Sequence, residues 1–90
     1  MNLLEFKKKH QDTFKRLKNK NSYVVYYANT EVCTATGYID IMKANDGVGY
    51  VSKDNYGYEQ KTIRGGCPKD ALIHHLFMND DEYGIIQGIE

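Results

Sequence analysis

The sequence has no tryptophan, one proline and two cysteines, and it contains no long apolar run. No stretch approaches the roughly 18 consecutive apolar residues of a membrane span, so the sequence excludes a membrane-spanning helix and a membrane partner. The first ten residues place apolar side chains before charged ones, which is the reverse of a secretory signal. Two cysteines do not make a disulfide framework, and we expect free thiols in a reducing cytoplasm.

The length of the chain limits it to one domain. Its 90 residues are expected to bury roughly 60–65 % of the surface that the unfolded chain exposes, which is enough for one modest core. We therefore expect a single domain over residues 1–90.

The net charge is zero, but the charges are unevenly distributed. Residues 1–20 carry seven Lys or Arg against two acidic residues, an excess of five positive charges. Residues 70–90 carry five acidic residues and no Lys or Arg. Such polarity fits either mutual neutralisation of the two ends or a basic patch that faces a partner.

Two segments have the pattern of amphipathic helices. In residues 3–19, apolar and aromatic side chains recur at spacings of three and four, which places them on one stripe. Asn2 is the expected N-cap, with Glu5 three residues later. The second helix is expected to begin at Pro68, which fits the first helical position, and to end at Asn79. The stripe of the first helix comprises Leu3, Phe6, His10, Phe14 and Leu17.

The segments between these helices have strand patterns. In residues 32–41 the alternation places Ile39 and Ile41 on one face and Tyr38 on the other. Asp46 and Gly47 predict a tight hairpin turn, because such turns need the positive φ that glycine adopts. The predicted fold is an α+β domain: an antiparallel four- to five-stranded meander, with an N-terminal and a C-terminal helix packed on one face. The predicted strands are residues 22–28, 32–41, 49–53 and 58–64, with 83–89 as a fifth.

Cys67 is the candidate nucleophile. It is expected at the N-terminus of the second helix, where the helix dipole and free N–H groups stabilise a thiolate. His74 lies seven residues further along the same helix, about 10 Å at 1.5 Å per residue, so it cannot contact the thiol. A cysteine-dependent enzyme at Cys67 is therefore only the third functional hypothesis, and no catalytic residue is predicted.

The metal-binding residue types have the wrong spacing for a site. Cys33 and Cys67 stand alone, whereas zinc sites use closely spaced pairs of ligands. His74 and His75 are adjacent on a helix and point about 100° apart, so they cannot both reach one ion. The sequence predicts no metal and no cofactor.

The start of the second helix offers a weak anion site. Arg64 and Lys69, together with the free N–H groups of the first turn, have the chemistry to hold one anion. A tight turn from strand to helix is the better explanation of the glycines at 65 and 66.

The same segment carries a resemblance to a known family. The order helix, meander, helix, together with GGCPKDAL at residues 65–72, resembles the double-stranded RNA-binding domain over eight residues. The second helix departs from that family, because it has no further lysines and ends in acidic residues, and no histidine-bearing loop lies between the strands. The alternative function is therefore a nucleic-acid or nucleotide binding module that uses the basic N-terminal helix. Its contact residues are expected to be Lys8, Lys15 and Arg16.

Tyrosine is the most informative residue type. Seven of the eight tyrosines lie between positions 23 and 58. Helices cover one face of so small a sheet, and the other face of an antiparallel sheet is often in contact with solvent. Tyrosine offers a large contact area at low entropic cost, as interfaces require. The predicted partner-binding residues are Tyr38, Tyr50, Tyr58, Thr34 and Thr36.

Taken together, these patterns favour a small cytoplasmic, non-enzymatic binding protein with a protein partner. Its most concrete form is a stoichiometric inhibitor, such as a phage or mobile-element product that blocks a host defence enzyme in the manner of an anti-CRISPR protein. Nucleic acid is the second candidate partner, and the sequence is compatible with a homo-oligomer.

Overall fold

The structure is a computed structural model that describes residues 1–28, 34–55 and 59–90, without the side chains of 59–64. Four helices and five strands occur in these residues. In chain order they are α1 (Leu3–Lys9), α2 (Gln11–Phe14), β1 (Ser22–Ala28), β2 (Thr34–Lys43), β3 (Tyr50–Asp54), β4 (Glu59–Gly65), α3 (Pro68–Met78), α4 (Asp80–Tyr83) and β5 (Ile85–Ile89).

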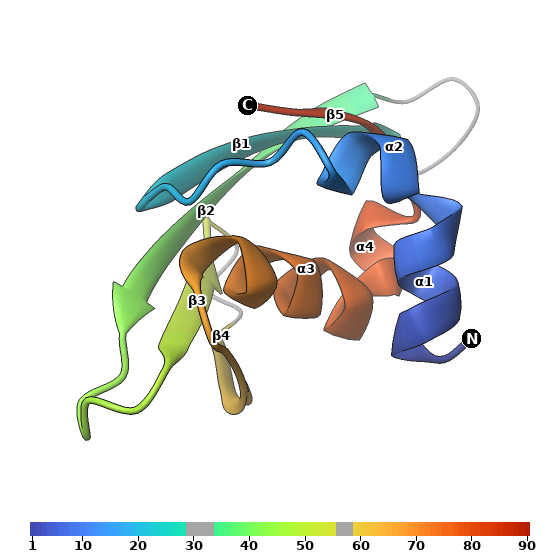
Figure 1. Cartoon of the computed structure of the whole chain (residues 1–90). Coiled ribbons are helices and arrows are strands. Elements are labelled where there is room, and N and C mark those ends of the chain that lie inside the picture. Colours follow the sequence, from blue (N-terminus) through green and yellow to red (C-terminus); the bar gives the residue numbers. More distant parts are fainter. Residues whose placement is uncertain (29–33, 56–58) are drawn as a thin grey trace.

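The strands form one antiparallel sheet in the order β4-β3-β2-β1-β5. The first four strands make a meander, and β5 pairs with the free edge of β1. Figure 1 shows the helices from both ends of the chain on the same side of this sheet. The predicted α+β fold is therefore confirmed. No helix in the described ranges has the length and apolar character needed to cross a bilayer.

The core lies between the sheet and the helices. Alternation along β1 turns Tyr23, Val25 and Tyr27 toward the helices, and all three are buried. Large side chains from the N-terminal and C-terminal helices pack against these strands, so both ends of the chain contribute to one core. The other buried members of this cluster include Phe6, Phe14, Ile39, Ile41, Leu72, Leu76 and Tyr83.

The ends of the predicted helices are set by local chemistry and agree with the sequence pattern. The N–H of Glu5 donates to Oδ1 of Asn2 at 2.8 Å, so Asn2 is the N-cap of α1. Pro68 begins α3 and Asn79 ends it. Cys67 occupies the N-cap position of α3, but its side chain makes no capping hydrogen bond.

The prediction of one helix over residues 3–19 is wrong. The helix breaks at His10, and α2 ends at Phe14. Beyond it, Oδ1 of Asn19 accepts from the N–H of Lys69 at 3.1 Å, and the N–H of Lys20 donates to the hydroxyl of Tyr23 at 3.0 Å. These contacts with α3 and with the buried ring of β1 hold the chain in a non-helical path.

The hairpin between β2 and β3 has the predicted turn. Gly47 has a φ of 78°, a value that side chains disfavour. Oδ1 of Asp46 accepts from the N–H of Val48 at 3.0 Å, which closes the turn. The fifth strand, which the sequence predicted over residues 83–89 as an addition to the four-stranded meander, is present as β5.

Candidate functional site

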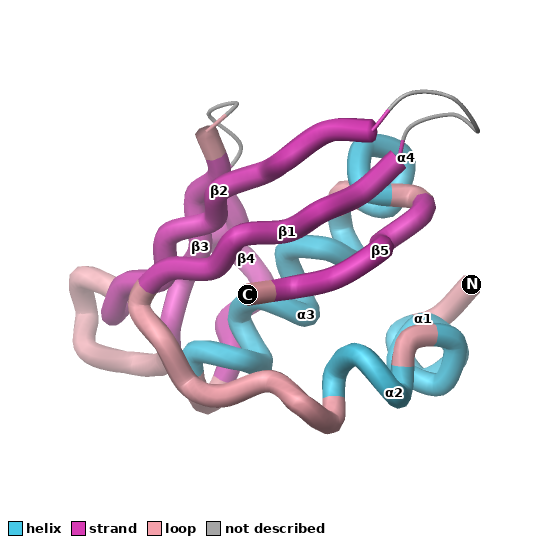
Figure 2. Tube along the Cα trace, turned by 90° about the horizontal axis from the view of Figure 1, so that it is seen from above, coloured by secondary structure: helices cyan, strands magenta, loops and turns pink. Residues whose placement is uncertain are grey.

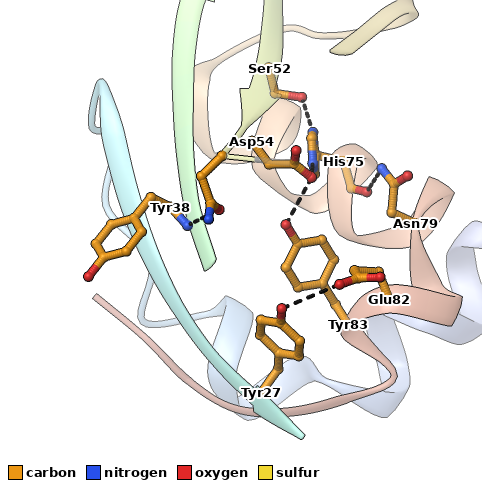
Figure 3. Close-up of polar contacts among 9 residues, drawn as sticks. Tyr27, Tyr38, Ser52, Asp54, His75, Asn79, Glu82 and Tyr83 are labelled. Atoms are coloured by element: carbon orange, nitrogen blue, oxygen red, sulfur yellow. Dashed lines mark hydrogen bonds and ion pairs between the residues drawn. The ribbon is translucent and has the colours of Figure 1, made fainter. Parts of the chain in front are cut away.

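The side of the sheet away from the helices is the candidate functional site. On this side, the strand register aligns Tyr26 with Thr36, Val24 with Tyr38 and Met42 with Val51. Tyr38 is 54 % exposed, Met42 44 % and Tyr26 38 %. Figure 3 shows the Tyr38 ring pointing away from the buried polar residues on the other side of the sheet. We call this surface the open-face patch: Val24, Tyr26, Thr36, Tyr38, Met42 and Val51.

Hydrogen bonds fix the backbone and one hydroxyl within the patch. Asn55 accepts from the N–H of Tyr38 through Oδ1 at 3.0 Å, and its own N–H donates to the carbonyl of Tyr38 at 3.0 Å. The hydroxyl of Tyr26 donates to Oε2 of Glu90 at 3.1 Å. This hydrogen bond and the negative charge of Glu90 raise the pKa of Tyr26. The patch is therefore built on a rigid scaffold.

The structure brings together three of the five predicted partner-binding residues. Thr34, Thr36 and Tyr38 share the open face of β2. The prediction that Tyr50 shares this face is wrong: Tyr50 aligns with Lys43, on the face of Ile41, and packs against the core. Tyr58 lies outside the described residues.

A polar network lies inside the core, on the other face of the sheet (Figure 3). His75 contacts the hydroxyl of Ser52 through Nδ1 at 2.7 Å and Oδ2 of Asp54 through Nε2 at 3.0 Å. The hydroxyl of Tyr83 donates to the same carboxylate oxygen at 3.0 Å. The side-chain amide of Asn79 donates to the carbonyl of His75 at 2.9 Å.

The combination of serine, histidine and aspartate raises the question of a catalytic triad. Burial excludes it, because His75 is 0 %, Ser52 1 % and Asp54 4 % exposed, so no substrate reaches the serine oxygen. Burial also lowers the pKa of His75, although the hydrogen bond and charge of Asp54 oppose this shift. A neutral imidazole that donates to Asp54 and accepts from Ser52 satisfies all three groups. The network is structural.

The three histidines predict how stability depends on pH. Burial is the largest cause that lowers the pKa of each of His10, His74 and His75 below its ordinary value. Because the unfolded chain then binds more protons near and below pH 6.5, the folded state loses stability as the pH falls. We expect the melting temperature to fall between pH 7.5 and 5, by about 4–8 °C for each kcal/mol lost. Thermal unfolding followed by circular dichroism measures this, and a constant or rising midpoint would contradict it.

The start of α3 holds the residues considered for an anion site and for a nucleophile. One of the amides on which the anion site depends, the N–H of Lys69, already donates to Asn19. The side chain of Arg64 lies outside the described residues. Cys67 is a partly buried free thiol, and His74 lies further along the same helix. Across the described residues, no three His, Cys, Asp or Glu side chains group in a way that would hold a metal ion.

The basic residues proposed for nucleic-acid binding do not share a helix. Lys8 is exposed on α1, whereas Lys15 and Arg16 are exposed after the end of α2. Nζ of Lys15 lies 3.6 Å from Oδ1 of Asp12, so part of this charge is balanced locally. The basic N-terminal helix predicted over residues 3–19 is therefore divided, and these three cations lie on α1 and in the segment after α2.

No family model matches the chain. No curated protein and no solved structure matches it either. A function for this protein therefore has to be inferred from its own residues.

Sequence reasoning missed the contribution of β1 to the open-face patch. The alternation in SYVVYYA separates Val24 and Tyr26 from the buried Tyr23, Val25 and Tyr27, so the signal was present in the sequence. Met42 is missed for a different reason: the predicted strand ended one residue earlier, at Ile41.

Proposed function

We propose that this protein is a non-enzymatic binding protein that docks a protein partner on the open-face patch. The observation that carries the proposal is the exposure of Tyr38, Tyr26 and Met42 on the face that the helices leave uncovered. Exposed groups of apolar side chains on small soluble domains mark interaction sites. Tyrosine and methionine are also enriched at interfaces between proteins.

The charges around the patch favour a protein over a nucleic acid. Asp40 aligns with Lys53 across β2 and β3, and Glu90 accepts a hydrogen bond from Tyr26. Among the described side chains, the face therefore has no excess of positive charge, whereas affinity for nucleic acid depends on Lys and Arg contacts with phosphates. A partner with a complementary apolar surface fits these residues better.

Stoichiometric inhibition is the form of binding that we propose. The side chains of Ser52, His75 and Asp54 are buried. They therefore give no support for a reaction catalysed on a bound partner. A small rigid domain that covers a partner's surface acts by occupying that surface. We place this activity in a reducing cytoplasm, in keeping with the free thiol of Cys67. A host defence enzyme blocked by a phage or mobile-element product remains the target class that we propose.

The substitution Tyr38→Ala tests the proposal. Affinity capture from host extract, followed by purification of the captured protein, supplies the partner for calorimetric titration. We expect a 1:1 complex whose affinity falls about thirtyfold in the variant, because truncation of a buried interface aromatic costs about 2 kcal/mol. The free energy of unfolding should change by no more than about 0.5 kcal/mol, because the ring is exposed in the free protein.

The matched control is Lys8→Glu with Lys15→Glu, which reverses charge away from the patch. This variant should bind the partner as tightly as the unmodified chain. If it abolishes binding while Tyr38→Ala binds normally, the open-face patch is not the site and the nucleic-acid interpretation prevails. If the free chain is a dimer that Tyr38→Ala dissociates, the occupant of the patch is a second copy and the inhibitor proposal fails.

A further inference from the structure

The loop between α2 and β1, whose path is drawn in Figure 2, carries several cations, and residues of this loop line a groove. Arg16, Lys18 and Lys20 lie in this loop, and all three are exposed. The space that they line has a volume of about 160 Å³. Its walls include Arg16, Lys18 and Lys20 from the loop and Tyr23, Ile89 and Glu90 from the strands.

Tyr23 fixes the shape of this groove. Its ring is buried in the core, with 1 % of the residue exposed. Its hydroxyl donates to the carbonyl of Lys18 and accepts from the N–H of Lys20 at 3.0 Å. Nζ of Lys20 lies 5.9 Å from the centre of the ring. The backbone of the loop is therefore held against the sheet.

The positive charge of the groove is not neutralised from within. Among the described residues, no ion pair involves Arg16, Lys18 or Lys20. Glu90 is the acidic residue of the wall, and its carboxylate accepts the hydroxyl of Tyr26 on the open face. Three cations and one carboxylate therefore line this space, which leaves an excess of two positive charges.

The size of the groove limits what it can hold. About 160 Å³ is several times the roughly 30 Å³ that one water occupies in the liquid. It is well below the roughly 300–1,000 Å³ of pockets that enclose a drug-sized ligand or cofactor. A tetrahedral oxyanion with its ester substituent fits these limits, and Arg and Lys are the side chains that bind phosphate oxygens.

We propose that this groove binds a phosphate group, carried by a nucleic-acid backbone or by a small phosphate ester. The site shares one contact with the open-face patch, the hydrogen bond between Tyr26 and Glu90, and is otherwise separate from it. Tyr23 lies on the opposite face of β1 from Tyr26, and none of the patch residues lines the groove. The phosphate site and the protein-binding face are therefore separable by substitution.

Titration with inorganic phosphate, followed by the amide chemical shifts of residues 16–23, tests the proposal. The groove variant combines Arg16→Gln, Lys18→Gln and Lys20→Gln. The control variant combines Lys7→Gln, Lys8→Gln and Lys9→Gln, which removes the same charge from α1. We expect saturable binding to the unmodified chain and to the control, and at least about tenfold weaker binding to the groove variant, because hydrogen bonds to charged groups are lost.

A short single-stranded oligonucleotide distinguishes the two sources of phosphate. Binding that is tighter than that of inorganic phosphate and weakens steeply with salt assigns the site to a nucleic-acid backbone. Equal or weaker binding assigns it to a small phosphate ester. Equal losses in the groove and control variants, or no saturable response of the unmodified chain, overturn the proposal. If thermal unfolding shows that the triple variant is not folded, Lys18→Gln alone carries the comparison under the same criteria.

Discussion

Replacing His75 with alanine is expected to lower the free energy of unfolding by about 3–5 kcal/mol. The imidazole is the contact between Ser52 and Asp54 in a part of the core with no access to water. Its removal leaves a buried carboxylate without its histidine partner, and removing one partner of a buried pair costs more than the pair itself contributes. A domain of this size has roughly 5–15 kcal/mol of stability in total, so the loss is a large fraction.

The matched control is the neighbouring substitution His74→Ala. His74 is on the same helix but only partly buried, and its Nδ1 already lacks a hydrogen-bond partner in the structure. We expect a cost of about 1 kcal/mol, typical of a point substitution. Urea unfolding followed by circular dichroism measures both values. Equal costs for the two variants would show that the contacts of His75 with Asp54 and Ser52 do not stabilise the fold.

The second large effect is expected at Gly65, where β4 passes against the start of α3. A methyl group at this position would lie 2.7 Å from Cα of Ala71 and from the carbonyl carbon of Asp70, and closer still to the nitrogen of Ala71. These are backbone atoms of a helix, which cannot move aside as a flexible side chain can. Gly65→Ala should therefore destabilise the protein by about 3 kcal/mol or more, measured by the same urea titration.

Gly66→Ala provides the comparison one residue away. Its added methyl group would have Oδ2 of Asp70 as its nearest neighbour at 3.9 Å, an ordinary van der Waals distance. The expected change is within about 0.5 kcal/mol. A stable Gly65→Ala variant would mean that α3 lies further from β4 than the structure places it.

The features predictable from the sequence are those fixed by neighbouring residues. Pro68 and Asn79 bound a helix because of what each does to its own backbone, and Asp46 with Gly47 closes a turn without help from the rest of the chain. Strand alternation likewise placed Tyr38 opposite Ile39, and the structure agrees. Features that depend only on neighbouring residues are therefore the ones that the sequence predicts correctly.

The features that were missed depend on contacts between distant residues. Tyr50 was placed on the wrong face because its strand register is set by the pairing of β3 with β2, which the local pattern does not specify. The break at His10 occurs where its ring packs edge-on against Phe6, with the ring centres 4.9 Å apart, and Phe6 in turn packs on Phe77. The partners of His75 lie more than 20 residues away in the chain. No spacing within the helix could reveal them.

The strand order also has a consequence for how the chain folds. The meander from β1 to β4 closes through short connections, whereas β5 must return past α3 and α4 to pair with β1. The entropic cost of closing a loop grows with its length, so the local hairpins are expected to form before β5 docks. Until then, one edge of β1 has unpaired backbone groups beside the side chains of Tyr26 and Tyr27. β1, an interior strand of the finished sheet, is thus an exposed edge in the nascent one, and the docking of β5 is the step that removes this hazard of misassembly.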